Sequence, residues 1–423
     1  MRIAIAALAG CFAAAGAPPP EKLTLAEAEA LALAIHPAIE AGKLDALAAH
    51  TRIDQARSAR YPFAVANTTA VGADNESRIG AGALNNPVLY SRIGAGVSVS
   101  QNVFDFGRTS HLIESSRASA AASDQRAGAT RADVILGVRR AYFSALRAEN
   151  VLRVAKATVE SRSLVVDQVS ELVRAQIKTS LDQSFAETNL AEGKLLVASA
   201  ENERLSAYAD LAQAIGRPLP GEVELADVAD NDGVPRDLAT FRERALQQRP
   251  ELKAIRLELA ASREFASAER AARYPSAAVV VSAGVVPAGG PKLSTEYAAA
   301  GVNLSLPFFN GGLYKARQAE ADLRARAIER RVAQLENGIT RDVSAAWLDA
   351  NTASQRIELT RQFVDQAGLA LELAQTRYDL GLSTIIELSQ AQLTKTNAEI
   401  QNTAAKYDYQ IRKSILEYFS GGL

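Results

Sequence analysis

The sequence predicts a mainly α-helical fold with a smaller β part, in which long antiparallel helical hairpins are joined to four β-strands. Three observations predict it. The chain contains the same pattern twice. Each copy has a long proline-free stretch with apolar residues at steps of three and four, and each has segments in which apolar and polar residues alternate. The first two patterns favour long paired helices, and the third favours strands.

The composition excludes several functional classes. Lys+Arg is 47 and Asp+Glu is 48, so the net charge of −1 gives no basic footprint for nucleic acid. The single cysteine is Cys11, the three histidines are scattered, and no metal-ligand spacing or phosphate-binding glycine loop is present. Asp105, between two phenylalanines, is better explained as a strand-to-helix cap than as a catalytic acid. We therefore predict no catalytic residue, metal or cofactor, and no enzyme.

Residues 1–20 read as an export leader. Arg2 supplies a positive start and residues 3–9 are apolar. Leu8-Ala9-Gly10-Cys11 resembles a lipobox, which predicts lipidation at Cys11. The alternatives are a plain signal peptide cut after Ala17 or, less favoured, a buried N-terminal helix.

The internal repeat sets the domain organisation. Pro37 and Pro62 recur as Pro250 and Pro275, an offset of 213 (250 − 37), and from Phe104 onward the offset is 205, as in Phe309 (309 − 104). Chance similarity between alanine-rich helices is the alternative, but one offset held over so long a stretch favours a true repeat. We predict a first repeat at 21–216, a linker at 217–236 and a second repeat at 237–423.

The proline-free stretches predict the long helices. No proline occurs between Pro87 and Pro218 or after Pro307, and interior proline breaks helices. Apolar or small residues form a heptad seam in both copies. In the second copy the seam is Val332, Leu335, Ile339, Val343, Ala346, Ala350, Ala353, Ile357, Thr360, Val364, Ala367, Leu371, Ala374 and Tyr378.

This pattern predicts helices over 110–176 and 313–379, each roughly 100 Å long. Shorter helices are expected at 38–60, 182–215, 251–273 and 387–418. The helical part is then an antiparallel bundle of two similar hairpin units.

Two β-hairpins are predicted, at 63–104 and 276–308. Ile93, Val97 and Val99 alternate with glycine and serine, and the second copy alternates similarly. Glycine-, asparagine- and proline-rich loops separate the strands, the second loop lying at 287–291. Aromatic residues near the strand ends are candidates for a membrane girdle: Tyr61, Phe63, Tyr90, Tyr274 and Tyr297.

The strand pattern points to a membrane barrel made by several chains. Strands of about ten residues, apolar on one side, are long enough to cross an outer membrane. A soluble hairpin packed on a helix is the alternative. The predicted export leader favours a membrane barrel over it. Four strands cannot close a barrel and open edges are not tolerated in lipid, so other copies must complete it; three chains would supply twelve strands.

Several motifs together resemble one family. They are the Tyr-Pro pairs before each hairpin, the strand exits Gln101-Asn-Val-Phe-Asp-Phe-Gly and Leu306-Pro-Phe-Phe-Asn-Gly-Gly, and the turn that begins Arg377-Tyr-Asp-Leu-Gly-Leu-Ser-Thr. Their order over residues 22–421 resembles the TolC/outer membrane efflux protein family. The resemblance implies a homotrimer in outer-membrane lipid, with a twelve-stranded barrel and a helical tunnel through the periplasm. It also implies a periplasmic adaptor and an inner-membrane transporter of the RND or ABC type as partners.

The same resemblance implies a periplasmic aperture. The family closes this end with acidic residues that match Glu387 and Gln390, and Gln390 departs from the pattern. Tyr378 matches a tyrosine that ties the second hairpin to an acid of the first, here Asp182, so a hydrogen bond between them is expected. Ser383 stands where some relatives have a basic residue. The alternative is that Asp182 and Glu387 only complement helix dipoles.

The predicted function is a passive outer-membrane duct of a tripartite efflux pump or type I secretion system. The alternative is an exported coiled-coil scaffold or adhesin without a pore. A scaffold would not need the alternating strands, so the strand pattern discriminates between the two.

Overall fold

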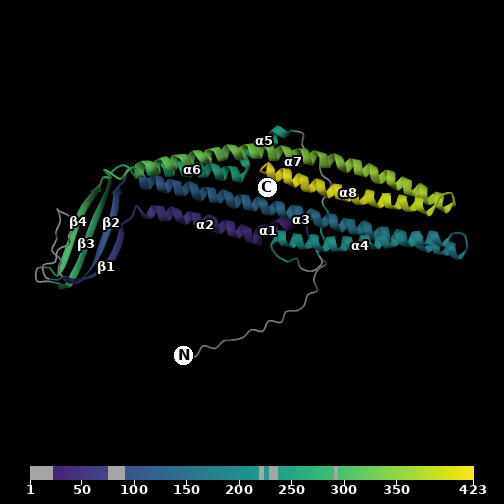
Figure 1. The fold of residues 1–423 in the computed structure, drawn as a ribbon, viewed down its shortest axis with the longest axis horizontal. Helices are drawn as coiled ribbons and strands as arrows, with labels where there is room; N and C mark the ends of the chain where they lie inside the picture. The colour runs from purple at the N-terminus through teal and green to yellow at the C-terminus, as the bar shows by residue number, and fades with distance from the viewer. Residues whose placement is uncertain (1–21, 75–90, 219–222, 228–236, 290–293) are drawn as a thin grey trace, which may run out of the picture. The chain divides into compact units, whose positions relative to one another are not determined.

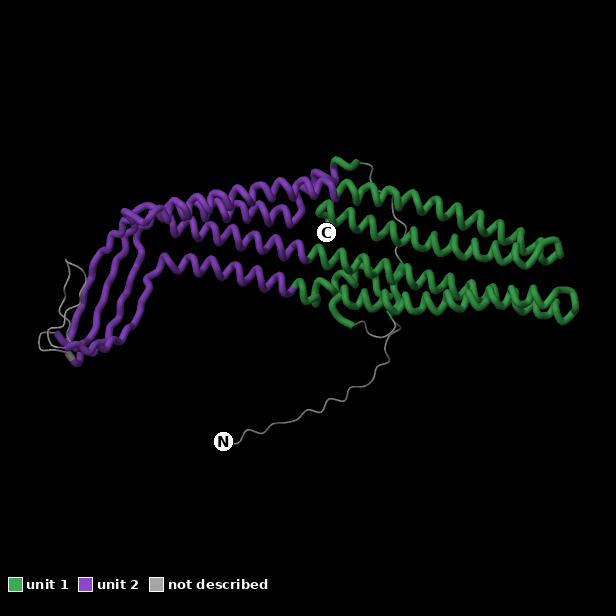
Figure 2. Tube along the Cα trace, in the orientation of Figure 1, with its two compact units in different colours: residues 1–39, 131–239, 343–423 green, residues 40–130, 240–342 purple. Residues whose placement is uncertain are grey.

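The computed structural model describes residues 22–74, 91–218, 223–227, 237–289 and 294–423. The predicted leader with Cys11, and Tyr90, lie outside the described residues. The chain divides into two compact units, distinguished by colour in Figure 2. Unit 1 comprises residues 1–39, 131–239 and 343–423, and unit 2 comprises residues 40–130 and 240–342. Each unit therefore contains parts of both sequence copies.

Helices form most of the described chain (Figure 1). The two longest, 67 residues each, are α3 (Arg108–Arg174) and α7 (Leu313–Asp379), within two residues of the predicted bounds. They are followed by α4 (Ser180–Ile215) and α8 (Ile385–Phe419). The helices before the strands are α1 (Leu25–Ile35), α2 (Pro37–Ser58), α5 (Leu238–Gln248) and α6 (Pro250–Ala271). No helix in these described ranges has the length and apolarity of a membrane span.

The heptad seam of α7 is its packed face, as predicted. All fourteen seam residues are buried or half-buried, and Ile339, Val343 and Ala350 are at most 1% exposed. Because many seam residues are alanine, the helices can approach closely. The seam therefore forms a thin core that extends along the helix rather than a thick globular one.

The start of α3 confirms the predicted cap at Asp105. Its carboxylate accepts hydrogen bonds from the backbone N–H groups of Gly107 (3.2 Å) and Thr109 (2.9 Å). Phe106 and Gly107 have positive φ angles of 53° and 84°, which turn the chain from strand to helix. Asp105 is thus a structural residue that satisfies otherwise unpaired helix donors.

The core of unit 1 is centred on Tyr142 of α3, which is 0% exposed. Its hydroxyl donates to the carbonyls of Leu23 (2.8 Å) and Ala226 (2.6 Å). Leu23 also forms a parallel β-bridge with Leu225. Tyr142 therefore joins the segment before α1, the segment after α4 and the middle of α3.

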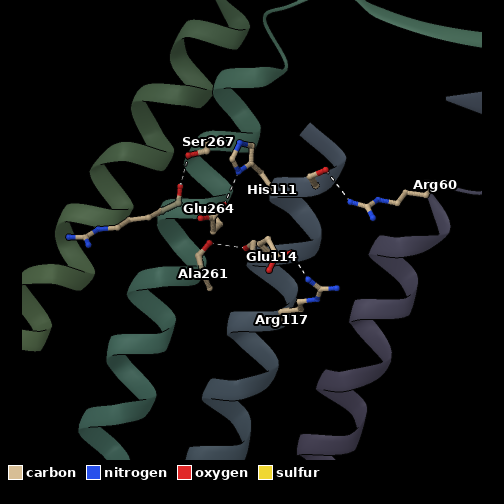
Figure 3. A network of polar contacts seen from close by, with 10 residues as sticks. Arg60, His111, Glu114, Arg117, Ala261, Glu264 and Ser267 are labelled. Atoms are coloured by element: carbon tan, nitrogen blue, oxygen red, sulfur yellow. Dashed lines mark hydrogen bonds and ion pairs between the residues drawn. The ribbon is translucent and has the colours of Figure 1, made fainter. Parts of the chain in front are cut away.

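In unit 2, polar contacts hold α6 of the second copy against α3 of the first (Figure 3). Nδ1 of His111 lies 2.7 Å from Oε2 of Glu264, and the Ser115 hydroxyl donates to the Ala261 carbonyl at 2.8 Å. Arg60, just after α2, donates to the Ser110 hydroxyl at 3.1 Å. These contacts bring three helices together close to where the strands begin.

The four strands form one antiparallel sheet in the order β1-β2-β3-β4. They are β1 (Phe63–Val71), β2 (Arg92–Phe104), β3 (Ser276–Gly289) and β4 (Glu296–Ser305). The sequence predicts the β1–β2 and β3–β4 hairpins. The structure adds the β2–β3 pairing, which joins the two copies. The fold class is confirmed: long helical hairpins with four antiparallel strands.

The sheet has one apolar and one polar face. Side chains on the apolar face are largely unpacked in the chain, being 42–75% exposed at Ile93, Val97, Val281, Val285, Val302 and Leu304. The other face carries the glycine, serine and asparagine residues of β2, β3 and β4, together with Phe63 and Val65 of β1. Directly opposite residues of an antiparallel pair point to the same side. The row Asn67–Gly96–Gly284–Tyr297 therefore belongs to the polar face.

Two details of the strand prediction were wrong. The loop predicted at 287–291 begins later, because β3 continues through Pro287 to Gly289. A register shift opposite residues 93–95 of β2 accommodates the proline, which has no N–H for the ladder. Tyr297 and Phe63 lie near strand ends as expected, but their register places both on the polar face and not on the apolar face, where a membrane girdle was expected.

Candidate functional site at the hairpin tips

The two helical hairpins of unit 1 turn with the same backbone geometry. After α7, Leu382 N–H donates to the Arg377 carbonyl (2.8 Å) and Gly381 N–H to the Tyr378 carbonyl (3.0 Å). After α3, Ile177 N–H and Gln176 N–H donate to the equivalent carbonyls at 2.9 and 3.0 Å. Both are Schellman motifs, which need one residue in the left-handed region. Gly381 (φ 71°) fills that position in one turn and Gln176 (φ 60°) in the other.

Replacing Gln176 with glycine should stabilise the first turn by about 0.5–1 kcal/mol, because the left-handed conformation costs a residue with a Cβ atom. The matched variant is Gly381→Ala. A Cβ there meets no atom within 4 Å, so only the backbone conformation opposes it, and we expect a loss of about 1 kcal/mol. The midpoint of thermal unfolding measures both. Shifts of the same sign would contradict the strain argument.

Asp182 is engaged in capping α4. Its carboxylate accepts hydrogen bonds from the backbone N–H (3.0 Å) and hydroxyl (2.8 Å) of Thr179, and the Thr179 hydroxyl accepts from Asp182 N–H at 3.3 Å. Hydrogen bonds from Thr179 chiefly lower the pKa of Asp182, with a smaller contribution from the Lys178 ammonium. Asp182 is therefore held as a carboxylate at the helix start.

Glu387, at the equivalent position of α8, is placed differently. Its backbone N–H is capped by the Thr384 hydroxyl (3.4 Å), but the structure gives its carboxylate no hydrogen bond or ion pair with a described residue. Glu387 is exposed, and so is Gln390 one turn later. Of the two predicted tip acids, Glu387 thus offers the carboxylate that the local helix cap does not use.

Tyr378 lies in a cluster between the two hairpins rather than in a polar pair. It is 4% exposed and packs with Val165, Val169, Ala186, Ile385 and Leu388. Its hydroxyl oxygen is buried and has no hydrogen-bond partner within the described chain. The predicted hydrogen bond from Tyr378 to Asp182 is therefore absent in the described chain, where the two bonds from Thr179 hold Oδ2 of that carboxylate in the α4 cap. Burial chiefly raises the pKa of Tyr378, and the nearby charge of Asp182 adds to this.

Lys178 is a tip residue that the sequence alone did not indicate. The Lys178 ammonium lies 4.3 Å from the centre of the Tyr378 ring, a cation–π contact between the first hairpin and the second. Ser383, which stands where some relatives have a basic residue, has a buried hydroxyl with no hydrogen-bond partner among the described residues. A lysine beside a turn has no distinguishing pattern in sequence, since the contact depends on how the hairpins pack.

Apolar side chains are exposed at both tips. Ile177 and Leu181 of the first hairpin are 67% and 64% exposed, and their repeat equivalents Leu382 and Ile386 are 67% and 57% exposed. Such side chains, repeated at equivalent positions, are typical of a surface that another protein covers.

Comparison with known proteins agrees with this architecture. The model of the outer membrane efflux protein family matches residues 30–217 and 241–422. Protein CyaE of Bordetella pertussis is 26% identical over 388 residues, covering 89% of this chain and 80% of its own length. Outer membrane protein TolC of Salmonella enteritidis is 22% identical over 398 residues, covering 92% and 80%.

A crystal structure of CusC has the same fold, with a TM-score of 0.81 at 18% identity over 94% of this chain and 92% of that one. The family match covers both sequence copies, with their helices and strands. The chain belongs to the outer membrane efflux protein family.

Proposed function

We propose that three copies of this chain form an outer-membrane duct whose periplasmic end is narrowed by the hairpin tips. The sheet is the observation that carries the proposal. β1 and β4 are its outer strands, so each has an unpaired edge within the described chain. The strands alternate in direction, so β4 of one copy can pair antiparallel with β1 of the next, and three copies close a ring without a free edge.

The two faces of the sheet support the same arrangement. The exposed apolar side chains of one face suit lipid, and the glycine, serine and asparagine of the other suit a water-filled lumen. An exported scaffold or adhesin without a pore would have no need for this pairing of an apolar face with open edges. The predicted division into repeats at 21–216 and 237–423, with a linker at 217–236, fits a duct built from two similar hairpin units per chain.

The partners follow from the same assignment. A passive duct needs a transporter of the RND or ABC type in the inner membrane and an adaptor that joins the two. The exposed Ile177, Leu181, Leu382 and Ile386 at the tips supply an apolar surface for the adaptor. Acylation of Cys11, if the lipobox is used, would anchor each copy in the inner leaflet of the outer membrane.

At the aperture we assign Glu387 the role of setting ion passage, with Gln390 beside it. Three Glu387 carboxylates around one axis would attract cations, and rings of acidic side chains confer cation selectivity in pores. Asp182 shapes the turn through its cap, and Tyr378 holds the two hairpins together through packing.

Single-channel recording of the purified protein in planar bilayers tests the proposal. Replacing Glu387 with glutamine should lower the preference for K⁺ over Cl⁻ by about twofold or more. A carboxylate about 8 Å from a permeating ion in water changes the free energy of that ion by about 0.5 kcal/mol. Glu160→Gln, which removes an exposed carboxylate about four turns before the end of α3, is the control and should change it less. A parent protein that forms no conducting channel would favour the scaffold instead. Equal effects of both substitutions would place the selectivity elsewhere.

A further inference from the structure

The polar face of the sheet contains a cleft of about 480 Å³ in unit 2. Arg92, Ser98 and Tyr297 line it, together with Asn67, Thr69 and Val286. Its volume falls within the roughly 300–1,000 Å³ of small-molecule sites. The lining combines one aromatic ring, one cation and several neutral hydrogen-bonding groups, a composition that selects ligands by chemistry rather than by size alone.

Two glycines place the aromatic wall of the cleft. Tyr297 is directly opposite Gly284, which is directly opposite Gly96. A Cβ atom at Gly284 would lie 2.6 Å from Cζ and Oη of Tyr297, and one at Gly96 would collide with the same hydroxyl. The tyrosine therefore lies across three strands on a floor without side chains, with 46% of the residue exposed. Nearly half of the residue is therefore accessible to a ligand in the cleft.

Arg92 supplies the positive charge of the cleft. It lies four residues before Gly96 on β2, so its side chain points to the same face of the sheet. It makes no hydrogen bond or ion pair with a described residue, and no other described residue lining the cleft is charged. The nearest acid on β4, Glu296, pairs with Val285 and lies on the opposite face. Within the described residues, no carboxylate competes with a bound anion for the guanidinium.

We infer that this cleft binds organic anions that carry an aromatic ring, and that it is a transient binding site in the lumen of the duct. The inference rests on the proposed function, which turns the polar face inward. The guanidinium pairs with a carboxylate, sulfonate or phosphate group, and the ring of the ligand stacks on Tyr297. In a trimer the cleft occurs three times around the lumen, so passing aromatic anions are retained longer than inorganic ones.

The test is block of single channels by three probes: benzenesulfonate, methanesulfonate and benzylammonium. Benzenesulfonate has the charge and the ring, methanesulfonate only the charge, and benzylammonium the ring with the opposite charge. We expect benzenesulfonate to interrupt the current at the lowest concentration. Arg92→Gln and Tyr297→Leu should each weaken its block by about fivefold, whereas Arg92→Lys and Tyr297→Phe should retain most of it.

Gly301→Ala is the matched control on the same face, because a Cβ there meets no atom within 4 Å. It should leave the block unchanged, whereas Gly96→Ala, which displaces Tyr297, should weaken it. Three results in a conducting channel would overturn the inference. They are equal block by all three probes, no block by benzenesulfonate, and block of the Arg92→Gln variant by benzenesulfonate as strong as that of the parent. Absence of any conductance in the parent protein would instead count against the proposed function.

Discussion

Replacing Tyr142 with alanine should destabilise the protein by about 3–5 kcal/mol, a typical cost of removing a large buried aromatic side chain. The ring is completely buried in the core of unit 1, and its hydroxyl joins the carbonyls of Leu23 and Ala226. Loss of the side chain leaves a cavity and leaves the Ala226 carbonyl without the bond that Tyr142 provides. The midpoint of thermal unfolding of the detergent-solubilised protein, followed by circular dichroism, measures the loss.

Tyr142→Phe separates the hydroxyl from the ring. It keeps the packing and removes the two hydrogen bonds, so we expect a smaller loss of about 1–3 kcal/mol. If phenylalanine is as harmful as alanine, the hydrogen bonds rather than the packing carry the stability of this region.

The pH dependence gives an independent measurement of the same residue. Burial chiefly raises the pKa of Tyr142 from 10.0 to about 12, and the nearby charge of Asp227 adds to the rise. A raised pKa in the folded state means that the unfolded chain loses this proton first. The stabilisation is complete below pH 10 and is lost as the pH rises towards about 12. Tyr142→Phe should flatten this alkaline decline.

Replacing Tyr378 with alanine should loosen the hairpin tips. The ring fills the space between α3, α4 and α8, and its removal should cost about 3–5 kcal/mol of local packing. If this substitution destabilises the closed state relative to the open state by only about 1.4 kcal/mol, the equilibrium between closed and open tips shifts tenfold. We therefore expect the open probability of single channels to rise by about tenfold or more.

Tyr378→Phe is the matched control. It removes a hydroxyl that has no hydrogen-bond partner among the described residues and keeps the ring in its cluster and under Lys178. The phenylalanine variant should conduct like the parent. An increase in open probability as large as that of the alanine variant would show that the hydroxyl holds the tip closed, for example through a contact with a neighbouring copy.

Local signals in the sequence determined the helices, the caps and the two hairpins. Heptad spacing and the absence of proline act within a few turns, so they placed α3 and α7 to within two residues. The Asp105 cap depends on donors at most four residues away. The order of the repeated motifs over residues 22–421 was sufficient to indicate the family, and as a member of it the chain is an outer-membrane channel protein.

Only the tertiary structure decided the pairing of β2 with β3 and the contacts of the tip. The β2–β3 pair joins segments well over a hundred residues apart, and no local pattern specifies its register. That register alone places Tyr297 over Gly96 and Gly284, on the polar rather than the apolar face. At the tip, Asp182 had two candidate donors, and Thr179, three residues before it, engages Oδ2 because an N-cap forms with little loss of chain entropy. Tyr378 is therefore held by packing between two hairpins, a property of the assembled fold that its position in the sequence does not contain.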